Sequence, residues 1–241
     1  MKLFSRFLGT RTFYQLLGQC MPWTMLGAVI FLSIGVVKGV FLVPPDYLQG
    51  EGFRILYVHV PAAIFSLAVY TVMFFCSCLY LVWKLKIADM IALASSAIGA
   101  SFALIALITG AIWGKPMWGT YWVWDARVVS EVILLFFYLG YLGLRGAIPN
   151  PLVAARASAI LAIVGMVDVP IVHFSVEWWT TLHQGSSLNV LRPKIAPVML
   201  YPLLSMLTGF GLFYLAVLCI RVRTEILKRE RHTRWVKMHQ F

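Results

Sequence analysis

Histidines close to clustered tryptophans are the residues of this chain whose types and spacing could do chemistry. His59 opens one long apolar stretch, His173 ends another, and His183 follows in a polar segment. A neutral imidazole offers a lone pair to a metal, and histidine is a common axial ligand of haem iron. A lone histidine is usually structural, whereas several among aromatic residues favour a planar ligand that carries a metal.

The aromatic residues near these histidines are mostly tryptophans, namely Trp113, Trp118, Trp122, Trp124, Trp178 and Trp179. Indole rings are flat and apolar, so several together make a platform for a large planar ligand. Trp118 and Trp122 would share a face of a helix, whereas Trp122 and Trp124 would share a face of an extended segment. The sequence does not choose between these geometries. A membrane interface also attracts tryptophan, but it would divide these residues between two faces.

Charged residues beside the tryptophans indicate how an anionic ligand group could be held. Asp125 stands where a helix would begin, so it could cap that helix while Arg127 reaches the ligand. Haem carries two propionates, and Arg54, Lys115, Arg127 and Arg192 are cations near the tryptophans and histidines that could meet them. With a planar ligand that carries a central iron, such as haem b, His59 and His183 could supply both axial positions. This spacing is suggestive of haem and does not by itself select it.

The composition places this site in a membrane protein. Of the 241 residues, 61% are hydrophobic and only 12% are charged, and the mean hydropathy is +0.85. A water-soluble core of this size could not bury so much apolar surface, which excludes a soluble enzyme, and disorder needs low hydrophobicity. The formal charge of +11 therefore indicates lipid headgroups and membrane topology rather than nucleic acid.

Apolar segments long enough to cross a bilayer occur six times, which predicts an all-α integral membrane protein with six transmembrane helices. These spans form a single domain over residues 1–241, at approximately 22–43, 58–83, 88–112, 128–144, 154–174 and 196–220. Residues 1–21 are typical of an amphipathic helix on the membrane surface, although a mitochondrial targeting segment would look similar. Residues 221–241 form a basic tail, which either anchors on anionic lipid or docks a cytoplasmic partner.

The basic residues also predict the orientation of the chain. They concentrate in residues 1–21, at 84–86, in 145–156 and in the tail. Because cytoplasmic flanks carry the excess of Lys and Arg, both termini are expected in the cytoplasm, or in the matrix of a mitochondrion. The opposite, outer face then holds the segments 44–57, 113–127 and 175–195.

Charges inside the predicted spans need partners, because an isolated ion in the bilayer is costly. Lys38 and Asp168 lie at similar depth, so we expect them to pair, and Arg127 is expected to pair with Glu131 at i,i+4. The alternatives are snorkelling of Lys38 and water contact for the two acids. A proton relay also stays open.

The segment 113–127 resembles the tryptophan-rich WWD signature of haem-handling membrane proteins. Within that group, segments 54–61 and 173–185 are similar to the CcmC family of the cytochrome c maturation system. The resemblance covers most of the chain. One departure is Val128-Val129-Ser130, where the signature usually continues Leu-Thr, and it affects little beyond local capping.

The resemblance implies a haem chaperone and export subunit rather than an enzyme. It implies a WWD loop on the periplasmic face of a bacterial inner membrane, with haem seated on its aromatic residues and ligated by His59 and His183. A mitochondrial inner membrane stays open. The implied partners are the ABC-transporter subunits CcmA and CcmB, the small CcmD, and the acceptor CcmE, to which haem is delivered. The chain has no nucleotide-binding motif, so ATP hydrolysis is expected from a partner.

Other functions remain as alternatives at this point. Haem lyases also carry the WWD signature, although they are generally longer and have additional spans. A small-molecule secondary transporter would have broken helices and polar groups deep in the bilayer. A purely structural subunit would have no use for the outer tryptophan cluster.

Overall fold

The computed structural model describes residues 9–183 and 195–238, and this part of the chain is almost entirely helical. Its helices are α2 (Thr10–Val36), the π-helical η1 (Val37–Leu42), the 3₁₀-helical η2 (Glu51–Ile55), α3 (Leu56–Trp83), α4 (Lys86–Trp118), α5 (Ala126–Ala147), α6 (Pro151–Gly165), α7 (Asp168–Trp178), α8 (Pro197–Arg229) and α9 (Arg234–Lys237). Six segments of the described residues are long and apolar enough to cross a membrane. This confirms the predicted all-α, six-span class.

Both ends of the chain differ from the predicted boundaries. Residues 10–21, predicted to lie on the membrane surface, form the first turns of α2, which continues through Pro22 as one helix. Residues 1–8 of that predicted segment lie outside the described residues. α8 likewise runs on to Arg229, so the predicted tail begins as a continuation of the last span. The length of the apolar segment therefore underestimates the length of both helices, because their charged ends extend past that segment.

The predicted fifth span is divided into two helices. α6 ends at Gly165 and α7 begins at Asp168, with a turn between them. The start of α6 follows from its sequence, because the Asn150 side chain accepts hydrogen bonds from the first backbone N–H groups and Pro151 occupies the first helical position. The break makes α7 a separate short helix beside α5.

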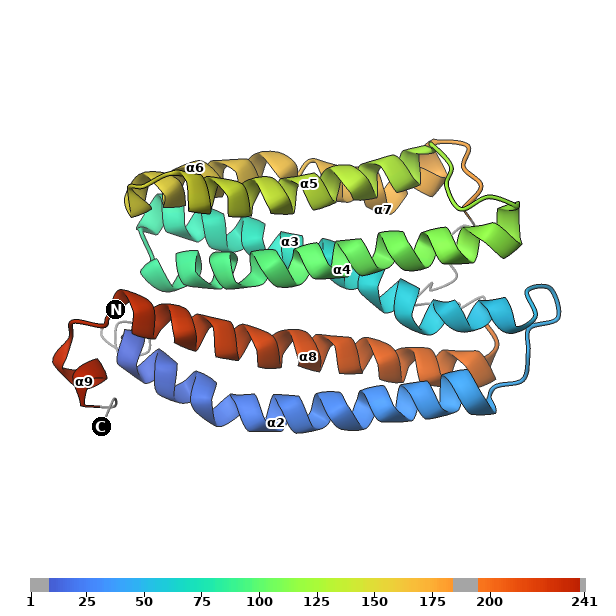
Figure 1. Cartoon of the computed structure of the whole chain (residues 1–241), viewed down its shortest axis with the longest axis horizontal. Helices are drawn as coiled ribbons and strands as arrows, with labels where there is room; N and C mark the ends of the chain where they lie inside the picture. The colour runs from blue at the N-terminus through green and yellow to red at the C-terminus, as the bar shows by residue number, and fades with distance from the viewer. Residues whose placement is uncertain (1–8, 184–194, 239–241) are drawn as a thin grey trace.

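Figure 1 shows the helices in three layers of neighbours. α2 packs along α8, α3 along α4, and α5 along α6 and α7. The middle layer of α3 and α4 contacts α8 on one side and the α5–α6–α7 layer on the other. α2 begins and α8 ends at the same end of the bundle. At the opposite end, α3, α5 and α8 begin and α4 and α7 end.

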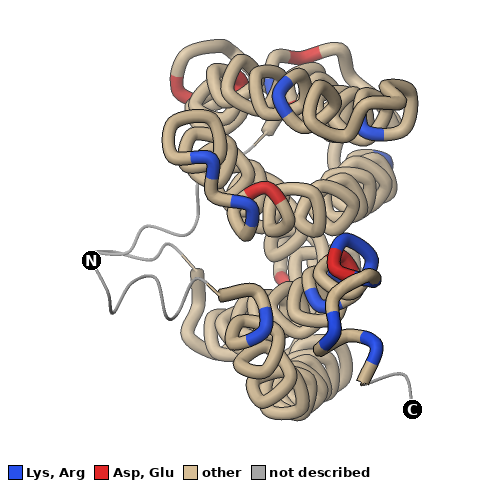
Figure 2. Tube along the Cα trace, turned by 90° about the vertical axis from the view of Figure 1, so that its left-hand side faces the viewer, with Lys and Arg blue, Asp and Glu red and all other residues tan. Residues whose placement is uncertain are grey.

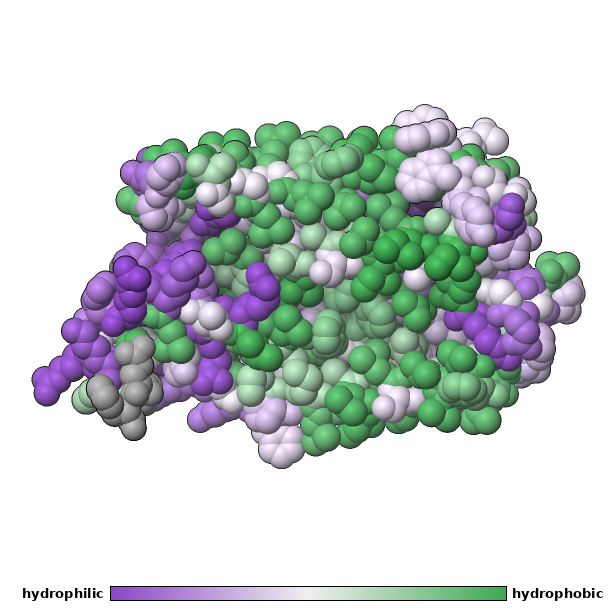
Figure 3. Space-filling model, in the orientation of Figure 1, coloured by the Kyte–Doolittle hydropathy of each residue, from purple (hydrophilic) through white to green (hydrophobic). Residues whose placement is uncertain are grey.

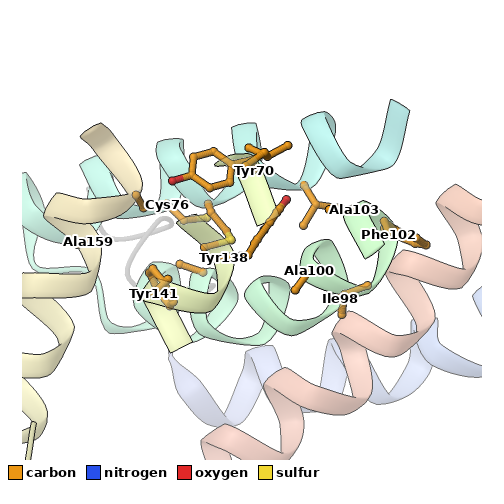
Figure 4. Packing of buried hydrophobic residues seen from close by; sticks show 14 of the residues in the cluster. Tyr70, Cys76, Ile98, Ala100, Phe102, Ala103, Tyr138, Tyr141 and Ala159 are labelled. Atoms are coloured by element: carbon orange, nitrogen blue, oxygen red, sulfur yellow. The ribbon is translucent and has the colours of Figure 1, made fainter. Parts of the chain in front are cut away.

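Small residues and buried tyrosines pack the middle layer against α5 (Figure 4). A Cβ at Gly99 of α4 would overlap the ring of Tyr138, so only glycine allows this approach. The Tyr138 hydroxyl donates to the Ser66 carbonyl at 2.6 Å, and its ring meets the Tyr70 ring edge-on with centroids 5.0 Å apart. Close helix packing through small residues is the usual way in which membrane helices associate.

An ion cluster around Asp89 joins three helices at the end where α2 begins. The Asp89 carboxylate of α4 is only 3% exposed and pairs with Arg145 of α5 and, at 2.8 Å, with Arg229 of α8. Figure 2 looks at this end and shows many of the Lys and Arg residues on it. Figure 3 shows hydrophobic residues across most of the visible face, with hydrophilic residues gathered mainly toward this same end.

Candidate binding site at one end of the bundle

His59 lies in the first turn of α3, and residues of α4 fix its ring. The Nδ1 atom is 3.0 Å from the Ala106 carbonyl oxygen and 3.1 Å from the Thr109 hydroxyl. The carbonyl can only accept, so Nδ1 carries the proton and Nε2 keeps its lone pair. Gly110 makes room for the ring, because a Cβ there would come within 3.0 Å of the His59 Cε1 atom. This arrangement suits a metal ligand, whose second ring nitrogen usually donates to a carbonyl.

His183 follows α7 and lies beside His59. The two ring centroids are 6.5 Å apart, and the centroids of the Trp118 and His183 rings are 4.9 Å apart. The Nδ1 atom of His183 is buried and has no hydrogen-bond partner among the described residues. Burial, together with the positive charge of Arg127, lowers the pKa of His183 to about 4. The imidazole is therefore neutral at pH 7 and can offer a lone pair.

The tryptophan segment changes conformation at Gly119. α4 carries both Trp113 and Trp118 and ends where Gly119 adopts a left-handed φ of 79°. The following residues are not helical, and the rings of Trp122 and Trp124 meet edge-on with centroids 5.4 Å apart. Of the two geometries that the sequence left open, the pairing of Trp122 with Trp124 is the one observed.

Two cavities meet at the histidine pair. The larger has a volume of about 290 Å³ and the smaller about 40 Å³. The residues common to both linings are His59, Ala63, Gly110, Trp118, Arg127 and His183. Trp113 lines the larger cavity, where Gln49 accepts a hydrogen bond from its indole N–H at 3.0 Å, and Trp122 lines the smaller. A flat ligand between the two imidazoles would extend into both spaces.

Asp125 and Arg127 occupy the start of α5. The Asp125 carboxylate accepts a hydrogen bond from the Val128 N–H at 2.9 Å, which confirms the predicted helix cap. Arg127 donates from Nη1 to the Val172 carbonyl of α7 at 2.8 Å. Its predicted ion pair with Glu131 does not form among the described residues, although their charges interact. Arg127 is instead a bridge between α5 and α7 at the border of both cavities.

Several predicted site residues lie away from the cavity linings. Arg54 pairs with Glu51 and donates to the Gly39 carbonyl at 2.9 Å, and Lys115 donates to the Gly119 carbonyl at 3.0 Å. The predicted site tryptophans that lie outside both linings are exposed, namely Trp124, Trp178 and Trp179. Arg192 lies outside the described residues. The structure therefore brings together His59, His183, Trp113, Trp118, Trp122 and Arg127.

The predicted ion pair between Lys38 and Asp168 is wrong. Lys38 is exposed on η1, which continues the α2 helix, and it pairs with no acid among the described residues. Asp168 is buried at the start of α7, in the layer farthest from α2 (Figure 1). Similar depth in the bilayer did not imply proximity, because the layers separate the two helices laterally.

Some residues at the site carried no signal in the sequence. Ala106 and Thr109 hold His59 from another helix, and Gln49 holds Trp113 from a loop. Contacts of this kind depend on which helices become neighbours, so spacing along the chain could not reveal them.

His173 also lines the larger cavity. Its position ten residues before His183 was the sequence signal that could have predicted its place at the site.

Six helices able to span a membrane, with a cavity lined by histidines and tryptophans at one end, define a multi-pass membrane protein. The chain matches the family model CcmC, described as heme exporter protein C, over residues 3–237. It therefore belongs to the heme exporter protein C family.

Individual relatives match over nearly their whole length. The heme exporter protein C of Haemophilus influenzae is 46% identical over 227 residues, which cover 94% of this chain and 92% of the relative. That of Escherichia coli K12 is 45% identical over 223 residues, covering 92% and 90%. That of Bradyrhizobium diazoefficiens is 43% identical over 218 residues, covering 90% and 82%.

Proposed function

We propose that this chain is a haem-handling subunit of cytochrome c maturation. It holds haem b as cargo at the outer end of the bundle and delivers it to an acceptor of the CcmE type. The observation that carries the proposal is the pair of neutral imidazoles, His59 and His183, whose ring centroids lie 6.5 Å apart at the junction of two cavities. Family membership supports the general role in handling haem.

The spacing of the imidazoles matches a bis-histidine iron. With metal–nitrogen bonds of about 2.0 Å and both rings on opposite sides of the metal, the ring centres would lie about 6.3 Å apart. The separation of 6.5 Å between His59 and His183 agrees with this value. One imidazole is held by α4, and the other presents a buried nitrogen that lacks a partner. A buried polar atom without a partner is costly, and iron would satisfy it.

The surroundings of the pair support a porphyrin. The indoles of Trp113, Trp118 and Trp122 line the two cavities and supply apolar, flat surface. Arg127 lies at their common border, where its guanidinium can bind a propionate through charge-assisted hydrogen bonds. Handover requires an accessible edge of the porphyrin. The exposed Trp124, 81% accessible, stands beside Trp122 and offers the acceptor an aromatic contact.

The proposed orientation puts the site at the periplasmic face of a bacterial inner membrane and both ends of the chain in the cytoplasm. It rests on the basic residues near the opposite end of the bundle, some of which appear in Figure 2. Subunits of the CcmA and CcmB type would supply ATP hydrolysis, since the chain has no nucleotide-binding motif, and a CcmD-type subunit would complete the complex.

The one feature that favours a secondary transporter is the break between α6 and α7, because transporters bind their substrates at broken helices. The cavity at the end of the bundle favours haem handling instead.

Absorption spectroscopy of the purified protein tests the proposal. Added hemin should give a Soret band of low-spin, six-coordinate iron in the wild type, and either His59→Ala or His183→Ala should abolish it. His232→Ala is the matched control, because His232 is exposed and follows α8, far from the cavity. This substitution should leave the spectrum unchanged. Identical spectra in all four proteins would overturn the ligand assignment.

A second experiment tests delivery. The chain loaded with hemin is mixed with a purified acceptor of the CcmE type, and haem on the acceptor is followed after separation. We expect transfer from the wild type and at least tenfold less from His59→Ala or His183→Ala. Equal transfer from the variants and from hemin alone would show that the chain does not deliver.

A further inference from the structure

His173 is the one histidine at the site to which the proposed function assigns no role. It lies on α7, whose buried face carries Val172 and Ser175 toward the bundle. His173 and Val176 are three residues apart, so they share another face of α7, and both line the larger cavity. The His173 imidazole is exposed and makes no hydrogen bond within the described part of the chain.

The larger cavity reaches from the histidine pair toward the middle of the membrane. On α3 it is lined from His59 down to Leu67, eight residues further along the helix. At a rise of about 1.5 Å per residue, this wall is about 12 Å deep. The lining along this wall is apolar, with Val60, Ala63 and Ile64 between the two ends. The cavity is therefore deep enough to admit an apolar ring from within the hydrocarbon.

The side of the cavity toward the bilayer is lightly covered. α7 packs mainly against α5 and makes few contacts with α3, so the two walls of the cavity are loosely joined. Ile64 on the α3 wall is 41% exposed, and His173 on the α7 wall is exposed as well. His173 lies five residues before the end of α7, within the span Pro151–Trp178. Such an ionisable residue inside a membrane span marks a functional site by default.

We propose that His173 is a third iron ligand, which captures the porphyrin as it enters sideways from the bilayer between α3 and α7. The ring then passes along the cavity to the final ligands, His59 and His183. This inference rests on the proposed function. Exchange of one imidazole for another keeps the iron coordinated throughout, so the porphyrin can move without a free, weakly bound state.

The position of His173 is tied to the anion-binding residue. Arg127 donates to the carbonyl of Val172, the residue immediately before His173. A propionate that reaches Arg127 therefore arrives beside the same turn of α7 that carries the capturing imidazole. α7 is also separated from α6 by the break after Gly165, which lets it adjust as the porphyrin passes.

Loading kinetics test the transit role. Hemin is supplied from phosphatidylcholine vesicles to the protein in a second set of vesicles, and the bis-histidine Soret band is followed over time. We expect His173→Gln to slow loading at least tenfold while the final spectrum stays that of the wild type. His173→Met should restore most of the rate, because a thioether also ligates haem iron whereas an amide does not. Equal rates in all three proteins would overturn the proposal, as would slow loading in both variants.

Variants without the final ligands test coordination itself. In His59→Ala/His183→Ala protein, ferrous haem should still show an iron–histidine stretch in resonance Raman spectra, and adding His173→Ala should remove it. If the double variant already lacks the signal, His173 is not a ligand. A failure of the proposed function looks different, because the wild type would then lack the bis-histidine spectrum from the start.

Discussion

The imidazoles of His59 and His183 are held in different ways, and this difference suits the proposed release of haem. His59 is fixed by the Ala106 carbonyl and the Thr109 hydroxyl, whereas the His183 ring has an unpartnered buried nitrogen and follows the end of α7. A ligand that is held by its second nitrogen is more basic and better oriented. We therefore expect the bond from iron to His183 to be the first to open during handover.

The neutral state of His183 gives a prediction at the residue scale. Its pKa is lowered to about 4, first by burial and then by the charge of Arg127. Removing that charge favours the protonated ring, so Arg127→Gln should raise the pKa toward 6.5. NMR titration of protein labelled at histidine measures both values, with the signal assigned by its loss in His183→Gln. A His183 pKa that is near 6.5 in the wild type would contradict the buried environment.

The space beside His59 gives a second prediction at this scale. Gly110→Ala places a methyl group 3.0 Å from the His59 Cε1 atom and pushes the ring from its position. We expect hemin affinity to fall about tenfold, equivalent to about 1.4 kcal/mol. Gly143→Ala is the control, since a Cβ at this helical glycine of α5 meets nothing within 4 Å. Affinities from hemin titration that fall equally in the two variants would indicate a general effect on the helices.

At the scale of elements, Asp89 joins α4, α5 and α8 through Arg145 and Arg229. Asp89→Asn leaves two arginines without their buried counter-ion, and breaking such a pair costs about 3–5 kcal/mol. The unfolding temperature in detergent should therefore fall by roughly 6 °C or more. Glu51→Gln, which removes the largely exposed partner of Arg54, should change it by less than about 2 °C. Equal shifts in the two variants would show that the Asp89 cluster does not hold the helices together.

The elements also show what the sequence can predict. Hydropathy predicted the six spans, because each span needs a continuous apolar segment that faces either lipid or the other helices. Asp125, a typical N-cap residue, predicted the start of α5. Hydropathy did not predict the break after Gly165, since Met166 and Val167 are as apolar as the helices beside them. Nor did it predict helix neighbours, so Lys38 was paired with the distant Asp168. The geometry of the histidine pair depends on those neighbours and needed the structure.

Over the whole molecule, the two ends of the bundle have different chemistry. The end where α2 begins carries the Asp89 cluster and many basic residues, and the other end carries the cavity with its tryptophans (Figures 1 and 2). The cavity lies where α7 of one outer layer and the start of α8 in the other flank the middle layer, so its walls come from three layers. Changes in how these layers pack would alter the cavity directly. This arrangement fits the proposed loading and release of haem at one face of the membrane.

Pulsed electron paramagnetic resonance of the ferric complex tests whether His59 and His183 both ligate the haem iron. With ¹⁵N-labelled histidine in the protein and unlabelled hemin, the spectrum counts the imidazole nitrogens bound to iron. We expect two such nitrogens in the wild type and one fewer after removal of either His59 or His183. A wild-type complex with no histidine nitrogen on the iron, or single variants that keep both, would contradict this assignment.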